Sequence, residues 1–170
     1  MNIFILHNNP IKAARMQCDK HIPKLVLESA QMMASALHRH GVKEESMPLT
    51  KSGTPYKVAH PNHPCTIWAG DSANNLLWLA DHAKALCVEY TKRFNKVHAC
   101  EAPIDHMTML IPIVGRMSTG VTPFAQAMPD EYRDDDAVTA YRAYYHSKEF
   151  AKWDKGTPAP SWWQGIGVVA

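Results

Sequence analysis

Apolar residues recur at intervals of three and four between residues 22 and 37, which is the spacing of one face of an α-helix. Asp19 precedes this run and suits a helix N-cap, and Gly41 follows it and suits the position just beyond a helix C-terminus. We therefore expect a long helix that begins near Asp19 and ends at about His40. Its core face consists of Ile22, Leu25, Val26, Ala30, Met33 and Leu37.

A second run of apolar residues at helical spacing predicts the central helix of the core, from the cap residue Ser72 to about Asn95. Shorter helices are expected over residues 11–17, 65–71 and 104–111. A last helix should be capped by Asp135 or Asp136 and run to about Trp153. The apolar face of the central helix consists of Leu76, Leu79, Ala80, Ala83, Leu86, Cys87 and Tyr90.

The remaining segments show neither helical nor strand periodicity over any length. Residues 2–6 predict a short buried strand or an extended arm, and residues 43–57 and 115–133 predict long ordered loops. The pattern as a whole therefore predicts an all-α fold, a compact single-domain helical bundle over residues 1–170. It has a short extended N-terminal segment and long ordered loops, and 170 residues suffice for one sizeable core.

Composition and charge exclude several classes of protein. The net charge is only +2, so a global nucleic-acid signature is missing, although a local basic patch at Lys84, Lys92, Arg93 and Lys96 is conceivable. No apolar run approaches ~18 residues and no charged leader opens the chain, so we expect a soluble, cytoplasmic protein without a membrane partner. The four cysteines are widely separated, which indicates reduced, buried thiols.

One polar stripe interrupts the long helix. Lys20, His21, Lys24, Glu28 and Gln31 fall within an arc of roughly 100° at 3.6 residues per turn. A solvated helix face with an ordinary Lys24–Glu28 pair is one interpretation. The other is an active site in which Glu28 serves as general acid or base, or stabilises a cation, and is tuned by its neighbours. The residues alone leave the two interpretations equal.

Other polar and aromatic residues are candidates for a binding site. His60 and His63 have a weak metal-ligand spacing, but further ligands are not evident, so no metal and no cofactor is expected, and a loop in which they bond to the backbone is favoured. Asn75 opens the central helix, and Gln126 lies in a proline-bent loop. Tyr141 and Tyr145 are either core residues or platforms for stacking bases.

The order of these segments resembles a family of small proteins of tailed bacteriophages, over nearly the whole chain. This resemblance implies a protein of the host-cell cytoplasm and brings no assigned activity with it. The matching stretches are residues 1–4, 19–21, 27–31, 56–68, 89–93, 126–130 and 140–145.

A more distant resemblance is to the phage pyrimidine-dimer DNA glycosylase of the endonuclease V type. It rests on Asp19-Lys20-His21 followed by Glu28 seven residues after the histidine, on Ala69-Gly70 before the second long helix, and on the late tyrosine cluster. The resemblance implies an all-α fold, a substrate of DNA with a damaged or modified base, and Glu28 as the catalytic glutamate.

The chain departs from that family at two places. The family attacks with the amine of an N-terminal threonine, whereas residue 2 here is Asn, which should prevent removal of Met1. Leu27 and Gln31 occupy the positions of the family's basic residues beside the glutamate. The available amines would then be that of Met1, which would be tied up if residues 2–6 form a strand, or that of Lys20 or Lys24 if burial lowered its pKa.

The sequence thus favours an enzyme that acts on DNA or a nucleotide, by N-glycosidic hydrolysis or by base modification. Glu28 is its central carboxylate, with His21 and Lys24 as tuning residues. The predicted substrate-binding residues are Lys20, Gln31, His60, His63, Asn75, Gln126, Tyr141 and Tyr145. The alternatives are a non-enzymatic accessory protein that binds a host protein or nucleic acid, and a metal-dependent enzyme that uses His60 and His63. The oligomeric state stays open.

Overall fold

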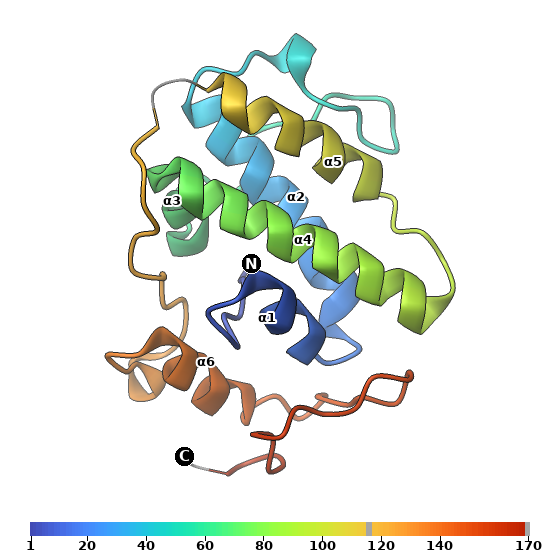
Figure 1. The fold of residues 1–170 in the computed structure, drawn as a ribbon, viewed down its shortest axis with the longest axis vertical. Coiled ribbons are helices and arrows are strands. Elements are labelled where there is room, and N and C mark those ends of the chain that lie inside the picture. Colours follow the sequence, from blue (N-terminus) through green and yellow to red (C-terminus); the bar gives the residue numbers. More distant parts are fainter. Residues whose placement is uncertain (115–116, 169–170) are drawn as a thin grey trace.

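A computed structural model describes residues 1–114 and 117–168 of the chain, and these form the predicted all-α fold (Figure 1). Three short 3₁₀ segments, Glu44–Ser46, Ile111–Ile113 and Asp130–Tyr132, join the helices of the described part. The helices are α1 (Pro10–Met16), α2 (His21–Arg39), α3 (Pro64–Asp71), α4 (Ala73–Phe94), α5 (Glu101–Leu110) and α6 (Ala137–Tyr145).

The two long helices α2 and α4 cross at the centre, and the others cover them (Figure 1). Helix α1 packs on α4, α3 packs on both long helices, and α5 covers the pair at the other end. Helix α6 and the C-terminal segment lie below α1 in Figure 1. The apolar faces predicted from sequence make the core, since Ile22, Leu25, Leu76 and Leu79 are fully buried.

Several helix ends follow the predicted local chemistry. The Ser72 hydroxyl accepts a hydrogen bond from the backbone N–H of Asn75 at 3.0 Å, and the Asp136 carboxylate caps α6. Helix α2 ends where Gly41 adopts a positive φ of 86°, and α4 ends at Asn95 in the left-handed region.

Two predicted helix ends are wrong. Asp19 does not cap α2, because its carboxylate binds Arg93 at 3.1 Å and the backbone N–H of Asp154 at 2.7 Å. Helix α6 ends at Tyr145, well before Trp153. The chain turns away after Tyr145 because Trp153 packs back on Tyr145 and donates a hydrogen bond to the carbonyl of Met16 at 3.2 Å.

The N-terminal segment is an arm rather than a strand, and the described residues contain only an isolated bridge between Leu49 and Pro55. The Asn2 side chain shapes the arm, because its Oδ1 accepts hydrogen bonds from Ile3 at 2.8 Å and from Phe4 at 3.1 Å. Phe4 adopts a positive φ of 51°. The predicted loop over residues 115–133 is extended from residue 117 onward except for one 3₁₀ turn; Gly115 and Arg116 lie outside the described residues.

Candidate active site

Glu28 lies in the third turn of α2 with its side chain 12% exposed, and the N-terminal arm closes over its carboxylate. Its Oε2 accepts a hydrogen bond from the backbone N–H of Asn2 at 3.0 Å. Its Oε1 lies 3.5 Å from the α-amino nitrogen of Met1 and 3.7 Å from Nζ of Lys24. One nearly buried carboxylate therefore faces a backbone amide and two primary amines.

The arm is fixed on both sides of Glu28. The Asn2 side chain donates a hydrogen bond to the carbonyl of Ala127 at 2.7 Å, which ties the arm to the loop before α6. The Met1 side chain is buried, and its sulfur accepts a hydrogen bond from the hydroxyl of Thr66 on α3 at 3.3 Å. The position of the amine thus depends on three segments that are distant in sequence.

His63 belongs to the same neighbourhood. It precedes α3, and its Nδ1 accepts a hydrogen bond from the backbone N–H of Cys65 at 3.2 Å, so a neutral ring carries its proton on Nε2. Burial lowers the pKa of His63, the Met1 amine and His60 lower it further, and Glu28 opposes them. A half-buried neutral imidazole therefore stands beside the carboxylate–amine pair.

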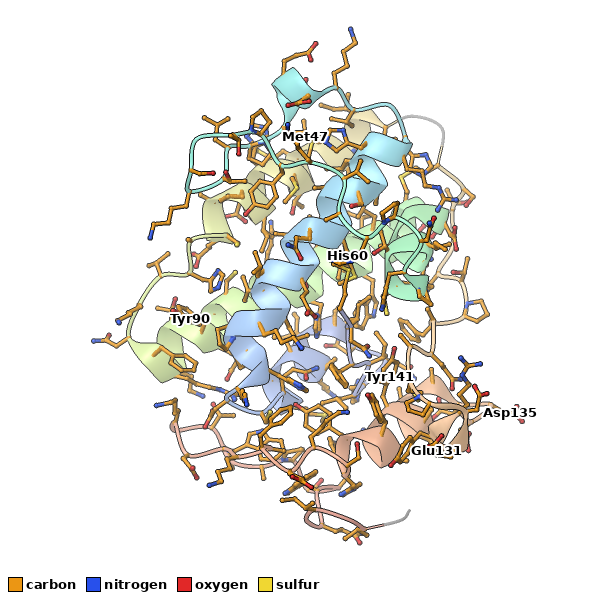
Figure 2. All side chains as sticks on the ribbon, turned by 180° about the vertical axis from the view of Figure 1, so that it is seen from behind. Met47, His60, Tyr90, Glu131, Asp135 and Tyr141 are labelled. Carbon is orange, nitrogen blue, oxygen red and sulfur yellow. The ribbon has the colours of Figure 1, made fainter. Side chains whose placement is uncertain are left out.

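His60 and Gln31 make no hydrogen bond or ion pair with Glu28 in the described part of the chain. His60 is exposed, with a positive φ of 48°, and its carbonyl accepts a hydrogen bond from the backbone of His63 at 3.1 Å (Figure 2). Gln31 is half-buried and lines a groove beside α2. His63 therefore comes to the Glu28 site, while His60 sits at the surface turn that precedes it.

His21 points into the core, away from the groups that contact Glu28. Its ring stacks on Phe4 with centroids 4.4 Å apart, and its Nδ1 forms a hydrogen bond with the hydroxyl of Tyr145 at 2.8 Å. Burial lowers the pKa of His21 to about 3, and Lys24, Lys148 and Lys20 add to the effect. His21 is thus neutral near pH 7.

The three lysines named above give the start of α2 a positive surface. Nζ of Lys20 lies 4.6 Å from the ring centroid of Phe150, and Nζ of Lys148 lies 3.3 Å from that of Tyr144. Lys24 is 58% exposed beside Glu28. This surface suits a polyanion. The basic patch considered from the sequence at Lys84, Lys92, Arg93 and Lys96 is less suited, because Arg93 is buried and Nζ of Lys84 lies 3.3 Å from the Asp105 carboxylate.

Two of the three tyrosines of α6, Tyr141 and Tyr145, are buried and hold other segments in place. The Tyr141 hydroxyl donates a hydrogen bond to the carbonyl of Ala125 at 2.8 Å and accepts one from the N–H of Ala127 at 3.1 Å (Figure 2). Because Ala127 also binds Asn2, Tyr141 supports the arm indirectly. The Tyr145 hydroxyl accepts from the backbone of Cys18 at 2.8 Å.

Asn75 and Gln126 are likewise engaged with the protein itself. The Asn75 amide donates to the carbonyl of Trp68 and to the hydroxyl of Thr122, both at 2.7 Å. The Gln126 amide bonds twice to the backbone of Asp134. These contacts order the long loop between α5 and α6.

Sequence reasoning missed the residues that position the arm. Asn2, Thr66 and Ala127 make the contacts that place Met1 and Glu28 together. The sequence predicts residues 2–6 as a strand or an extended arm, but nothing in a local pattern predicts that this segment folds against α2 and α3.

The fold and the site define a helical protein with a carboxylate–amine pair at the edge of a basic surface. The family model of pyrimidine dimer DNA glycosylase matches residues 1–102, which contain Met1, Lys24, Glu28 and His63, and the chain belongs to this family. Comparisons with curated proteins and with solved structures found no match.

Two further features concern the described residues only. No helix among them is long and apolar enough to cross a membrane. Across the same ranges, no group of three His, Cys, Asp or Glu side chains is arranged to hold a metal ion.

Proposed function

We propose that the protein excises a damaged or modified pyrimidine from DNA and that Glu28 is its catalytic carboxylate. The observation that carries this proposal is the placement of two primary amines and one backbone amide around Glu28 at 3.0–3.7 Å. Breaking an N-glycosidic bond develops positive charge on the sugar, and a fixed carboxylate stabilises that charge or activates a water molecule.

The two amines beside Oε1 are the proposed nucleophiles. In this step an uncharged amine nitrogen attacks C1′ as the bond from C1′ to the base breaks, and the departing base takes up a proton. The amine then loses a proton and the sugar ring opens to an imine. The Met1 side chain is buried beside Glu28, whereas that of Lys24 is 58% exposed, so the Met1 amine is the preferred candidate.

The supporting residues are assigned by their contacts. His63 is proposed to exchange protons with the leaving base or with water, because it is the neutral imidazole next to Glu28. Lys20 and Lys148, together with Lys24, are proposed to bind DNA phosphates. His21 is proposed to act on the site only by packing against Phe4 in the arm.

Glu28→Gln is the direct test. The amide keeps the shape of the side chain but removes its charge, so base release from a duplex with a thymine dimer or a modified pyrimidine should fall by about 10²–10⁴-fold. Glu45→Gln, in the exposed 3₁₀ turn after α2, is the control and should keep full activity. Undiminished base release by Glu28→Gln would remove Glu28 from the mechanism.

Borohydride reduction of the reacting complex identifies the nucleophile. It converts an imine into a stable protein–DNA bond, and peptide mapping then shows whether Met1 or Lys24 carries the sugar. Base release without any trapped complex would indicate attack by water. DNA binding without base release in the wild-type protein would favour the accessory-protein alternative.

A further inference from the structure

A groove of about 800 Å³ runs along α2, on the face of the helix that carries Leu27 and Gln31. One wall is the row of α2 residues Pro23, Leu27 and Gln31, and another is the loop that contains Tyr56 and Val58. Residues 50–52 and 98–100 complete the lining. Its size is that of a pocket for a whole small ligand, which typically measures about 300–1,000 Å³. The groove is therefore larger than the space that the reaction at the Glu28 carboxylate requires.

The groove and the carboxylate occupy neighbouring rows of the same helix. Residues three apart on a helix are surface neighbours, so Leu27 adjoins Lys24 and Gln31 adjoins Glu28. A sugar placed at Glu28 and the Met1 amine would therefore have the groove within reach of its base.

One loop forms the outer wall of the groove and also leads to the reaction centre. Ser35 on α2 holds this loop, because its hydroxyl donates to the carbonyl of Ala59 at 2.9 Å and accepts from the N–H of Ala59 at 2.8 Å. The chain then turns at His60 and reaches His63 beside Glu28. Figure 2 shows the loop at His60 running along α2.

The chemistry of the walls is mainly apolar, with some polar groups. Leu27 is 45% exposed and Val58 is 52% exposed, although both line the groove. Gln31 offers an amide, and Lys51 and Lys57 also line the groove, with Nζ of Lys57 3.7 Å from the Glu44 carboxylate. Such exposed apolar side chains stabilise a complex when a ligand covers them and removes them from water.

We propose that this groove receives a bulky, largely apolar substituent on C5 of the pyrimidine, and that the enzyme selects pyrimidines enlarged in this way. The proposal rests on the proposed function at Glu28. C5 is the position at which a pyrimidine carries a substituent without disturbing base pairing, as the thymine methyl group does in the major groove. An ordinary pyrimidine or a thymine dimer places nothing of comparable length in the groove.

The test compares three duplexes of one sequence. They contain a single 5-octadiynyl-2′-deoxyuridine, a single thymine dimer or only ordinary thymidine, and base release is measured as kcat/KM. The wild-type protein should release the octadiynyl base at least about tenfold faster than it repairs the dimer, since each methylene in an apolar pocket is worth about tenfold or more.

Two variants fill the groove from opposite walls. Leu27→Trp and Val58→Trp should each abolish the preference for the octadiynyl base. Leu77→Trp on α4, where the leucine is similarly exposed at 40%, is the matched control and should retain the preference. All three positions are at the surface, so the folded state tolerates the larger ring.

The outcomes separate this inference from the proposed function. Release of the dimer that depends on Glu28, with no preference for the octadiynyl base, would overturn the groove assignment alone. A preference that Leu27→Trp and Val58→Trp leave intact would overturn it as well. Release of no base from any duplex would overturn both proposals.

Discussion

At the scale of single residues, two buried histidines stand out because both are neutral for physical reasons. His21 forms a hydrogen bond with Tyr145, whereas neither ring nitrogen of His82 has a partner among the described residues. The His82 ring stacks on Trp78 with centroids 5.2 Å apart. Complete burial lowers the pKa of His82 to about 3. Such a residue makes folding sensitive to acid.

The stability of the protein should therefore decrease as the pH falls below about 6.5. The unfolded histidine binds a proton near pH 6.5, while the folded one stays neutral down to about 3. The contribution of His82 to the free energy of unfolding is thus fully present above pH 6.5 and is lost progressively as the pH falls toward 3. His82→Phe keeps the stack on Trp78 and should reduce the slope of unfolding free energy by up to about 1.4 kcal/mol per pH unit.

Urea unfolding at several pH values between 4 and 7 measures this slope. Leu77→Phe, which removes no titratable group at an exposed position of α4, serves as the control and should leave the slope of the wild-type protein unchanged. An identical slope in the His82→Phe protein would show that His82 is not a source of acid sensitivity.

At the scale of helices, the sequence predicts correctly those features that depend on residues close together in the chain. The apolar rows of α2 and α4 recur over many turns, so the existence of both helices and their C-terminal ends before Gly41 and at Asn95 were predicted correctly. Asp19 and the end of α6 were predicted wrongly, because a partner distant in sequence outweighs a local preference in each case. The Arg93 guanidinium donates a hydrogen bond to the Asp19 carboxylate, and the Trp153 indole N–H donates one to the carbonyl of Met16.

Arg93 shows how strong such distant partners are. Its guanidinium is fully buried and bonds to Glu89 at 2.9 Å, to Asp19 at 3.1 Å and to the carbonyls of Gln17 and Arg15 at 2.8 and 3.0 Å. It therefore joins α4 to the end of α1 and to the start of α2.

Arg93→Ala should destabilise the protein by about 3–5 kcal/mol, because it leaves two buried carboxylates without their cation. Arg133→Ala removes an exposed pair with Asp130 and should cost no more than about 1 kcal/mol. Denaturant unfolding of both variants provides the comparison, and equal losses would contradict the assigned role of Arg93.

At the scale of the whole molecule, the site is assembled from four separate segments. Glu28, Lys24 and His63 were predicted as site residues from their types and spacing together with the resemblance to the glycosylase family, and their roles stay a prediction. The contribution of the arm and of Ala127 could not be predicted, because it arises from contacts between residues that are 26, 65 and 125 positions apart. Asn75, Gln126 and Tyr145 looked like binding residues, and in the fold they satisfy buried or loop backbone groups.

Binding to duplex DNA should depend on salt through the lysines at the start of α2. If Lys20, Lys24 and Lys148 each neutralise one phosphate, changing all three to Gln should reduce the slope of log K against log salt by roughly 3, at about 0.9 per contact. Fluorescence anisotropy between 50 and 200 mM salt measures this slope.

The matched control changes three lysines elsewhere on the surface. Lys12 lies on α1, Lys43 follows α2 and Lys84 lies on α4, so their triple change to Gln alters net charge equally. A slope that falls as much in this control would indicate general attraction rather than a defined DNA-binding surface.

The hydrogen bond between Asn2 and Ala127 ties the N-terminal arm to a part of the chain that lies beyond the matched family pattern. The family pattern ends at residue 102, yet Ala127 and Tyr141 beyond it hold the arm that closes on Glu28. A fragment cut at that boundary would keep the reacting groups and lose the scaffold that orients them. If Glu28 acts as proposed, each piece is expected to be inert by itself, because the bond between Asn2 and Ala127 joins the two pieces.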